Sequence, residues 1–366
     1  MTRAYVGLDV HSKLTQFVIQ SEDGTVKYRG QVPTTPEGLR CLKTQYRLPE
    51  GTQVGLETGT MANYVARQLL GLELEPVVID AGEVRRKASR PRQKSDRRDA
   101  FEVCDGLRKD QYRSTVPLPP LHIQVLRDTL ARRRHFVRVQ SAEVNAAKHL
   151  LRYSGLRHLS RPLATDAAWD KLGAKVEDLQ LRRQIDFHHQ VWRAAVDQVQ
   201  HLNASLLEQS RRFQSEILRL QTAPGVGLIV SLTVLASFWD PGRFPSPQHA
   251  ASYAGLVPST DQSGDRDRHG RITKQGSPEL RAMLCQAAHH ARRKSNPLQP
   301  YFSSLCARRG YNVAVTAVAH RLCRILFAML RDKAEFDVRK LGIEAGPFER
   351  KIVMPYRLKR KPAQRD

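Results

Sequence analysis

Four carboxylates in the first hundred residues stand where they could share one metal ion. Asp9 closes an apolar run that begins at residue 4, and Glu57 closes a second run that begins at residue 53. Asp96 and Asp99 are three residues apart behind Ser95, a residue type that caps helices, so one helical face would present both. Functional side chains of α/β sheets gather beyond the carboxyl ends of strands. The spacing therefore predicts that the four acids face one cleft.

Oxygen donors of this kind suit Mg²⁺ or Mn²⁺. Two such ions about 4 Å apart can activate an attacking oxygen and stabilise a leaving oxygen during phosphodiester cleavage. Taken singly, each acid is more often a solvated surface residue, and Asp96 also fits an ordinary acid at a helix start. Their joint placement at two strand ends and one helix start favours the metal site.

The charge balance indicates a polyanionic partner. The 366 residues include 60 Lys and Arg against 36 Asp and Glu, a formal net charge of +24. Basic side chains gain free energy by displacing counterions condensed on phosphates. A basic strip lies beside the acidic pair and comprises Arg85, Arg86, Lys87, Arg90, Arg92, Lys94, Arg97 and Arg98.

We expect this partner to be nucleic acid rather than a membrane surface. The longest apolar candidate, residues 226–239, is too short to span a bilayer, and no basic-then-apolar leader precedes the first strand. The expected location is cytoplasmic and DNA-associated. The five cysteines include no Cys-x-x-Cys pair, so neither a zinc finger nor a disulfide framework is indicated.

The N-terminal pattern predicts a mixed α/β domain. Strands are expected over 4–10, 15–20 and 26–32, the last two joined by the turn residues Glu22-Asp23-Gly24. A helix begins at Thr35-Pro36, since Thr caps and Pro suits the first turn. Two further strands, 53–57 and 76–79, flank a helix over 63–72. The first three strands should form a meander, and the later ones should join through helical crossovers.

The middle of the chain reads as two long helices. The first, over 121–151, is basic, and the second runs from about residue 170 to 220. Apolar residues recur in the second helix every seven positions, at Ile185, Trp192, Val199, Leu206, Phe213 and Leu220. This repeat predicts a coiled-coil seam, either between subunits or within a hairpin. The alternative is a long helix that packs on its own chain.

The last part of the chain reads as mainly helical. We expect an apolar helix that ends at Phe238, helices that start at Pro247 and Pro278, and an apolar helix over 312–330. Residues 256–276 should form a loop or hairpin. The predicted domains are an acidic metal domain (1–150), a coiled-coil segment (151–221), a second catalytic domain (222–335) and a basic tail (336–366).

Three N-terminal motifs carry a family resemblance. Gly7-Leu8-Asp9-Val10, Leu56-Glu57-Thr58-Gly59-Thr60 and Lys94-Ser95-Asp96-Arg97-Arg98-Asp99-Ala100 resemble those of the DEDD transposases of bacterial insertion sequences and the related Piv-type invertases. The resemblance implies a domain similar to the RuvC Holliday-junction resolvase, with a ribonuclease-H-like fold. It also implies that the metal-binding tetrad is Asp9, Glu57, Asp96 and Asp99.

The C-terminal half resembles the second domain of the same family in order and spacing. The matching segments are residues 223–227, 253–258, 262–264 and 270–276. A serine before glycine acts as a nucleophile in that domain, and Ser263 fits the position. The resemblance thus implies attack by Ser263 on a DNA phosphodiester to give a covalent phosphoserine link. From the residues alone, Ser263 is a turn residue without an obvious general base. Nearby cations that could hold a phosphate are Arg266, Arg268, Arg271 and Lys274.

The resemblance also implies partners. They are a structured bridge RNA that selects donor and target DNA by pairing, and further copies of this chain in a dimer or tetramer. The turn at 224–227 resembles a helix-hairpin-helix, whose amides can point at a phosphate, although an ordinary helix connection has the same signature. Three departures from the family are the charged segment 265–268, where a Ser/Gly-rich loop is common, the Arg97-Arg98 pair, and His11, where many relatives have a small residue.

Three other functions remain open at this point. A metal-dependent junction nuclease would use the acids with water as nucleophile. An actin-like sugar kinase could open its phosphate-binding hairpin with Gly7-Leu8-Asp9, but it would explain neither the net charge nor the paired Asp96 and Asp99. A non-catalytic nucleic-acid-binding protein would carry the same charge without dependence on Mg²⁺.

Overall fold

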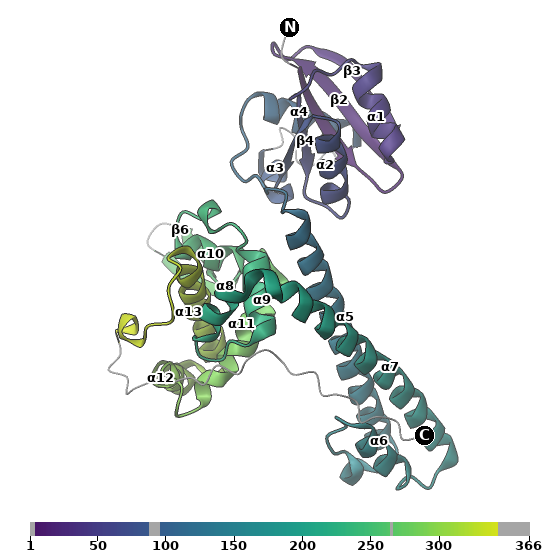
Figure 1. Ribbon diagram of the computed structural model, residues 1–366, viewed down its shortest axis with the longest axis vertical. Helices are drawn as coiled ribbons and strands as arrows, with labels where there is room; N and C mark the ends of the chain where they lie inside the picture. The colour runs from purple at the N-terminus through teal and green to yellow at the C-terminus, as the bar shows by residue number, and fades with distance from the viewer. Residues whose placement is uncertain (1–3, 88–95, 264–265, 343–366) are drawn as a thin grey trace. The chain divides into compact units, whose positions relative to one another are not determined.

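The computed structural model describes residues 4–87, 96–263 and 266–342, apart from the side chains of 96, 97 and 260–269. The chain forms two compact units, Met1–Pro119 and Pro120–Asp366, which are described separately below (Figure 1). Unit 1 is the α/β part, and the described residues of unit 2 are helical except for one strand pair.

Unit 1 is built on a five-stranded mixed sheet with the order β3-β2-β1-β4-β5. The first three strands form the predicted antiparallel meander, whereas β4 pairs in parallel with β1, and β5 with β4. The strands are β1 (Ala4–Val10), β2 (Leu14–Ser21), β3 (Val26–Pro33), β4 (Gln53–Glu57) and β5 (Glu75–Ile79). The predicted α/β class and strand order are confirmed.

Helices cover both faces of this sheet. On one face, α1 (Pro36–Gln45) and α2 (Ala62–Gly71) pack on Val6, Leu8 and their neighbours in the main core of the unit. The predicted Thr35 cap is present, because its Oγ1 accepts a hydrogen bond from Gly38 N at 3.1 Å. On the other face, α4 (Asp96–Arg108) packs on Tyr5 and Val18. A short helix that the sequence did not predict, α3 (Ala81–Lys87), follows β5.

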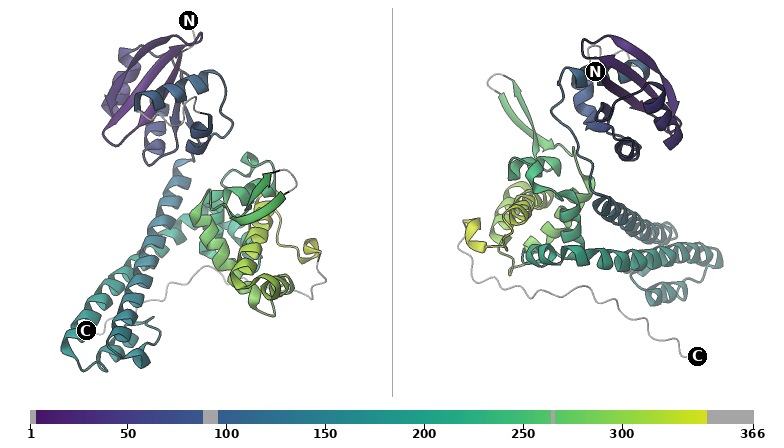
Figure 2. Two further views of the ribbon diagram at one scale, coloured as in Figure 1. Left: turned by 180° about the vertical axis from the view of Figure 1, so that it is seen from behind. Right: turned by 45° about the horizontal axis from the view of Figure 1, so that its top comes forward.

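Unit 2 begins with a helical hairpin. Helices α5 (Leu121–Tyr153) and α7 (Leu179–Ser210) lie side by side and antiparallel, with α6 (Asp166–Gly173) packed at the closed end (Figure 2). The seam residues Ile185 and Trp192 are buried in one core with α5 residues of the same chain. Helix α7 therefore packs on its own chain in a helical hairpin, while the coiled-coil seam and association between subunits stay predictions.

The predicted single helix from about residue 170 to 220 is wrong. The Asp178 carboxylate accepts a hydrogen bond from Leu181 N at 2.9 Å, which starts α7 afresh after α6 has ended at Gly173. At its far end, α7 stops at Ser210, and a 3₁₀ turn, Arg211–Phe213, separates it from α8 (Gln214–Gln221). The heptad repeat thus runs through three helical segments.

The rest of unit 2 is a helical core with a projecting strand pair. The predicted capping serines are confirmed, since Ser246 caps α10 and Ser277 caps α11. Strands β6 (Pro258–Ser263) and β7 (Arg266–Ile272) form the hairpin predicted within 256–276 (Figure 2). The helices are α9 (Leu228–Ser237), α10 (Pro247–Tyr253), α11 (Pro278–Ala288), the unpredicted α12 (Gln299–Arg309) and α13 (Tyr311–Arg331).

Helix α13 corrects one expectation about apolar length. By length and composition alone it could cross a membrane, and it is longer than residues 226–239. It carries Arg321 and Arg324, however, and its apolar side chains Val318, Leu322 and Phe327 are buried in the core of unit 2. A core helix of this kind meets the same criteria, so it is weak evidence for a membrane span.

Candidate functional site

Asp9 and Glu57 are neighbours at the carboxyl ends of adjacent parallel strands. In the β1–β4 ladder, Gly7 is opposite Gly55 and Leu8 is opposite Leu56. Asp9 and Glu57 are the next residues of these two strands. Neighbouring strands lie about 4.8 Å apart, and side chains at one level of a parallel pair point to the same face. The register therefore makes Asp9 and Glu57 neighbours on adjacent strands, which is the adjacency that the predicted cleft requires.

Two glycines place α4 on the face that carries both acids. A Cβ atom at Gly7 would lie 2.3 Å from Ala100 O and 2.4 Å from Cys104 N, and a Cβ at Gly55 would lie 2.9 Å from Val103 Cγ1. Side chains alternate along a strand, so Gly7 shares a face with Asp9, and Gly55 shares it with Glu57. Close approach of the helix backbone thus requires the glycine at position 7.

The helix runs toward the acids as it nears its own N-terminus. Cys104 Sγ donates a hydrogen bond to Tyr5 O at 3.3 Å, whereas Ala100, one turn earlier, lies over Gly7. Ala100 and Val103 face the sheet. Asp96 lies four positions before Ala100, and Asp99 lies four positions before Val103. Residues four apart share one side of a helix, so both acids belong to the sheet-facing side of α4. This spacing would direct the acidic positions of α4 toward the end of the sheet that carries Asp9 and Glu57.

The acidic set fits a divalent cation by its chemistry, because four carboxylates supply only hard oxygen donors. Asp99 is half-buried, and the side chain of Asp96 lies outside the described residues. The described side chains include three of the four acids, and among them no three His, Cys, Asp or Glu residues form a metal-binding group. The tetrad stays a prediction, supported by the strand register and the placement of α4.

His11 is a contact partner of Asp9 that the sequence did not predict. Its Nε2 lies 3.0 Å from Asp9 Oδ2, and the Asp9 side chain is 20% exposed. In the tautomer that carries a hydrogen on Nε2, His11 donates a hydrogen bond to that oxygen and can orient the carboxylate. The spacing of two residues behind a strand-terminal acid is the signal that could have identified this contact.

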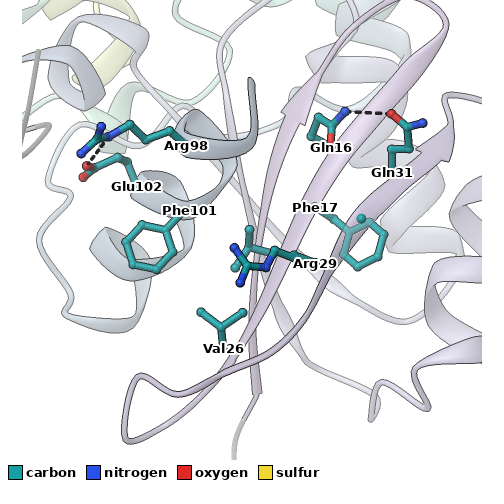
Figure 3. Close-up of a pocket in the computed structure, with 10 residues that line it drawn as sticks. Gln16, Phe17, Val26, Arg29, Gln31, Arg98, Phe101 and Glu102 are labelled. Carbon is teal, nitrogen blue, oxygen red and sulfur yellow. Dashed lines mark hydrogen bonds and ion pairs between the residues drawn. The ribbon is translucent and has the colours of Figure 1, made fainter. Parts of the chain in front are cut away.

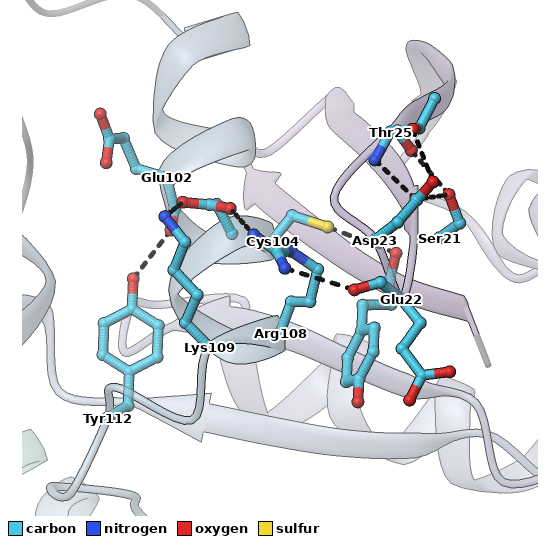
Figure 4. A network of polar contacts seen from close by, with 11 residues as sticks. Ser21, Glu22, Asp23, Thr25, Glu102, Cys104, Arg108, Lys109 and Tyr112 are labelled. Carbon is cyan, nitrogen blue, oxygen red and sulfur yellow. Dashed lines mark hydrogen bonds and ion pairs between the residues drawn. The ribbon is translucent and has the colours of Figure 1, made fainter.

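A polar network fixes the far end of α4 (Figure 4). Arg108 donates to Glu22 O at 3.3 Å and, with Lys109, pairs with Asp105 at 2.7 and 2.6 Å. Burial alone would raise the pKa of Asp105, but the hydrogen bonds from Lys109 and Arg108 outweigh it and lower that pKa. The network holds the C-terminal half of α4 against the β2–β3 turn and so positions its acidic start.

The predicted basic strip is only partly described. Arg85 and Arg86 are exposed on α3, while Arg90, Arg92 and Lys94 lie outside the described residues. Lys87 pairs with Glu83 at 2.7 Å and also donates to Gln111 O, so it already has partners within unit 1. Phosphate binding by this strip stays a prediction.

Ser263 lies at the tip of the β6–β7 hairpin in unit 2. It is the last residue of β6 and is opposite Arg266, the first residue of β7. Its side chain and those of Arg266 and Arg268 are outside the described residues, whereas Arg271 and Lys274 are exposed. The structure thus places Ser263 at an end of a strand pair, and its nucleophilic role stays a prediction.

The turn at 224–227 packs against the protein itself at one point. Gly225 has φ +79°, and a Cβ there would lie 2.5 Å from Ala287 O of α11. Glycine is therefore required for packing at this position, which favours a helix connection. Phosphate binding by this turn stays a prediction.

Two family models match separate parts of the chain. The DEDD model of the IS110 group, described as "Transposase", matches residues 6–154, which include all four predicted acids. The model described as "Transposase IS116/IS110/IS902 family" matches residues 218–303, which include Ser263. The order of the two matches agrees with the two sets of motifs.

Curated relatives that match this chain include two transposases and a gene-inverting protein. The chain is 28% identical to a "Probable family 20 transposase" of Pseudomonas aeruginosa over 76% of this chain and 83% of that protein. It is 33% identical to the "Transposase for insertion sequence element IS1111A" of Coxiella burnetii over 31% of this chain and 32% of that protein. A "Pilin gene-inverting protein" of Moraxella bovis is 28% identical over 40% of this chain and 47% of its own length.

Proposed function

Since this chain belongs to the IS110/IS116 family of transposases, enzymes of DNA recombination, we propose that it cuts and rejoins DNA through Ser263, assisted by a divalent metal on its acidic tetrad. The observation that carries the metal site is the β1–β4 register, which makes Asp9 and Glu57 neighbours. The four carboxylates would hold Mg²⁺ or Mn²⁺, which when bound supplies a Lewis acid for the phosphate oxygens.

We also propose that unit 1 has the ribonuclease-H-like fold of RuvC. The strand order β3-β2-β1-β4-β5, with an antiparallel meander followed by two parallel strands, supports this fold. Helix α4, packed on Gly7 and Gly55, supplies the last two acids of the tetrad. In this arrangement the sheet and the helix each fix two of the four carboxylates.

In the proposed reaction, the hydroxyl oxygen of Ser263 attacks a DNA phosphorus atom. A serine O–P bond forms, a backbone P–O bond breaks, and the proton lost by serine is balanced by protonation of the leaving strand oxygen. Attack by a strand hydroxyl on the phosphoserine reverses these steps and joins the ends. The cations that would hold the phosphate near the hairpin are Arg266, Arg268, Arg271 and Lys274.

The proposed partners follow from this reaction and from the charge of +24. Strand exchange requires two DNA duplexes, and a dimer or tetramer would hold both. A bridge RNA encoded by the element would select donor and target, as the family resemblance implies. The enzyme would act on DNA in the cytoplasm.

The test is an adduct assay with full-length protein, the flanks of the native element as DNA, its noncoding region as RNA, and Mg²⁺. Wild type should yield an SDS-resistant protein–DNA adduct that is lost in Ser263→Ala and in Asp9→Asn. Ser252→Ala, which removes an exposed serine from α10, is the matched control and should behave as wild type. Cleavage without an adduct that survives Ser263→Ala but not Asp9→Asn would instead assign a metal nuclease that uses water.

A further inference from the structure

A groove opens beside α4 on the face of the sheet that carries the acids. Helix α4 packs closely on β1 and β4, and between it and the β2–β3 pair lies a cavity of about 610 Å³ (Figure 3). That volume lies within the range of about 300–1,000 Å³ typical of small-ligand sites. Its lining includes Gln16, Val18, Arg29, Gln31, Arg98 and Phe101.

The strand register places this groove next to the acidic site. In the antiparallel ladders, Asp9 is opposite Gln16, and Gln16 is opposite Gln31. Glu57, Asp9, Gln16 and Gln31 therefore form one row across four strands, on the face covered by α4. The groove begins one strand away from Asp9, about 5 Å along the row.

The groove combines a cation, an aromatic ring and amides. Arg29 is exposed and forms no ion pair among the residues that the structure describes, and Figure 3 shows it reaching from β3 toward Phe101. Phe101 on α4 is 37% exposed. Gln16 Nε2 donates to Gln31 Oε1 at 2.9 Å, which fixes the two amides side by side. Arg98 lies 3.8 Å from Glu102 and is partly neutralised by it, so Arg29 is the better phosphate ligand.

We propose that this groove binds one unpaired nucleotide of the DNA strand whose adjacent phosphate lies at Asp9 and Glu57. Its base stacks on Phe101, its phosphate pairs with Arg29, and the Gln16–Gln31 amides contact the base or sugar. Aromatic stacking tolerates any base, because every base has a π face. The inference rests on the proposed function, because it takes the acids as the point of strand cleavage.

The test measures binding and stacking separately, in Ca²⁺ to suppress cleavage. The probe is a short single-stranded oligodeoxynucleotide that contains 2-aminopurine, whose fluorescence falls on stacking. Wild type should quench it, and Phe101→Leu, which keeps apolar bulk, should abolish the quenching and weaken binding about five- to a hundredfold. Arg29→Gln should weaken binding and reduce the salt slope by about 0.7, the loss of one single-strand phosphate contact.

Matched controls lie outside the groove. Arg40→Gln changes an exposed arginine of α1, and Phe187→Leu changes an exposed phenylalanine of α7. Both should bind and quench as wild type, with melting curves recorded for all variants. If Phe101→Leu and Arg29→Gln match these controls, the proposal is overturned. Stronger quenching by an oligoribonucleotide of the same sequence would also overturn it, because the groove would then belong to the RNA.

A parallel cleavage assay separates this proposal from the proposed function. Asp9→Asn should lose cleavage and keep the quenching. If quenching depends on Phe101 but the protein never cuts DNA, the proposed function is contradicted and nucleotide binding in the groove is supported. If cleavage requires Asp9 but is unchanged in Phe101→Leu and Arg29→Gln, the proposed function is supported and nucleotide binding in the groove is contradicted.

Discussion

Asp9 is held in two ways, by its strand and by His11. The β1–β4 register fixes its backbone beside Glu57, and His11 Nε2 lies 3.0 Å from one carboxylate oxygen. Partners that orient a metal-binding carboxylate commonly affect metal affinity or activity by about 10- to 100-fold. His11 is therefore a positioning residue in this account, one step removed from the reaction.

We predict that His11→Ala raises the Mg²⁺ concentration needed for half-maximal cleavage by about tenfold and leaves the maximal rate nearly unchanged. The reason is that the carboxylate becomes less well oriented while every proposed metal ligand is retained. A titration of Mg²⁺ against the cleavage rate measures the effect. A Mg²⁺ response identical to that of wild type would show that the His11–Asp9 contact plays no part in metal binding.

Glu83 is a buried acid of α3 that accepts hydrogen bonds from the backbone of residues 113–114, which follow α4. Burial opposes its ionisation, but Lys87 and the backbone N–H groups of Arg113 and Ser114 outweigh burial and lower its pKa from 4.5 to about 2. A carboxylate with a lowered folded-state pKa stabilises the fold above its unfolded pKa. That stability is lost as the pH falls from about 4.5 to about 2.

We predict that Glu83→Gln lowers the free energy of unfolding at neutral pH by about 1.5–3 kcal/mol, the usual contribution of hydrogen bonds to a charged group. The variant should also lose less stability than wild type between about pH 4.5 and pH 2, because the titrating group is absent. Urea unfolding followed across this pH range measures both effects. If the free energy of unfolding falls equally for both proteins between about pH 4.5 and pH 2, this role of Glu83 is contradicted.

At the scale of elements, α4 and its two glycines decide where the tetrad forms. A methyl group at Gly7 would collide with Ala100 O and Cys104 N, both of them backbone atoms that cannot rotate away. The helix must then lift from β1, and Asp96 and Asp99 move with it. Gly59, in the second motif, has no atom within 4 Å of an added Cβ and is the matched control.

We predict that Gly7→Ala destabilises the protein by about 1–3 kcal/mol, as overpacking usually does, and reduces cleavage far more than Gly59→Ala. Thermal unfolding and the cleavage assay, run on both variants, measure the two effects. If Gly7→Ala is as stable and active as Gly59→Ala, close packing of α4 is not what sets the site.

The sequence predicts those elements whose signals are local. Thr35, Ser246 and Ser277 cap helices as expected. Strand β4 ends at Glu57 as expected, whereas β1 runs one residue beyond Asp9, to Val10. Asp178 is also a capping residue type, but the heptad repeat predicts one continuous helix across this region. The sequence did not predict the short α3 and α12. The start of α3 has a local signal, because Asp80 Oδ1 accepts a hydrogen bond from Glu83 N at 3.0 Å, whereas Leu298 before α12 makes no side-chain cap.

The same distinction between local signals and long-range packing applies to the candidate site. Its four acids could be chosen from strand ends and helix spacing. The row formed by Glu57, Asp9, Gln16 and Gln31 could not, because it depends on the register of three separate strand pairings. The collision at Gly7 was equally hidden, because only the packed helix shows which glycine meets a backbone.

At the scale of the whole molecule, the helical hairpin gives partners to two polar residues, His189 and Asn203, that lie between the apolar positions of the heptad repeat. Asn203 Oδ1 accepts a hydrogen bond from Arg133 at 2.6 Å, and His189 stacks on Trp169 and contacts Asp166 at 3.0 Å. These polar side chains have partners in the same chain, so the seam is used within the hairpin. Subunit association would then use other residues, and the exposed apolar residues of the hairpin include Leu179, Phe187 and Val191.

The most direct test of the central claim, that the acids gather around one divalent ion, is Mn²⁺ binding by the full chain, followed by electron paramagnetic resonance. Wild type should bind Mn²⁺, while Asp9→Asn, Glu57→Gln and Asp99→Asn should each weaken binding by about tenfold or more. Glu50→Gln, at an exposed acid that precedes β4 and so lies at the opposite end of that strand from Glu57, should bind as wild type. Mn²⁺ binding by Asp9→Asn and Asp99→Asn equal to that of Glu50→Gln would contradict the account.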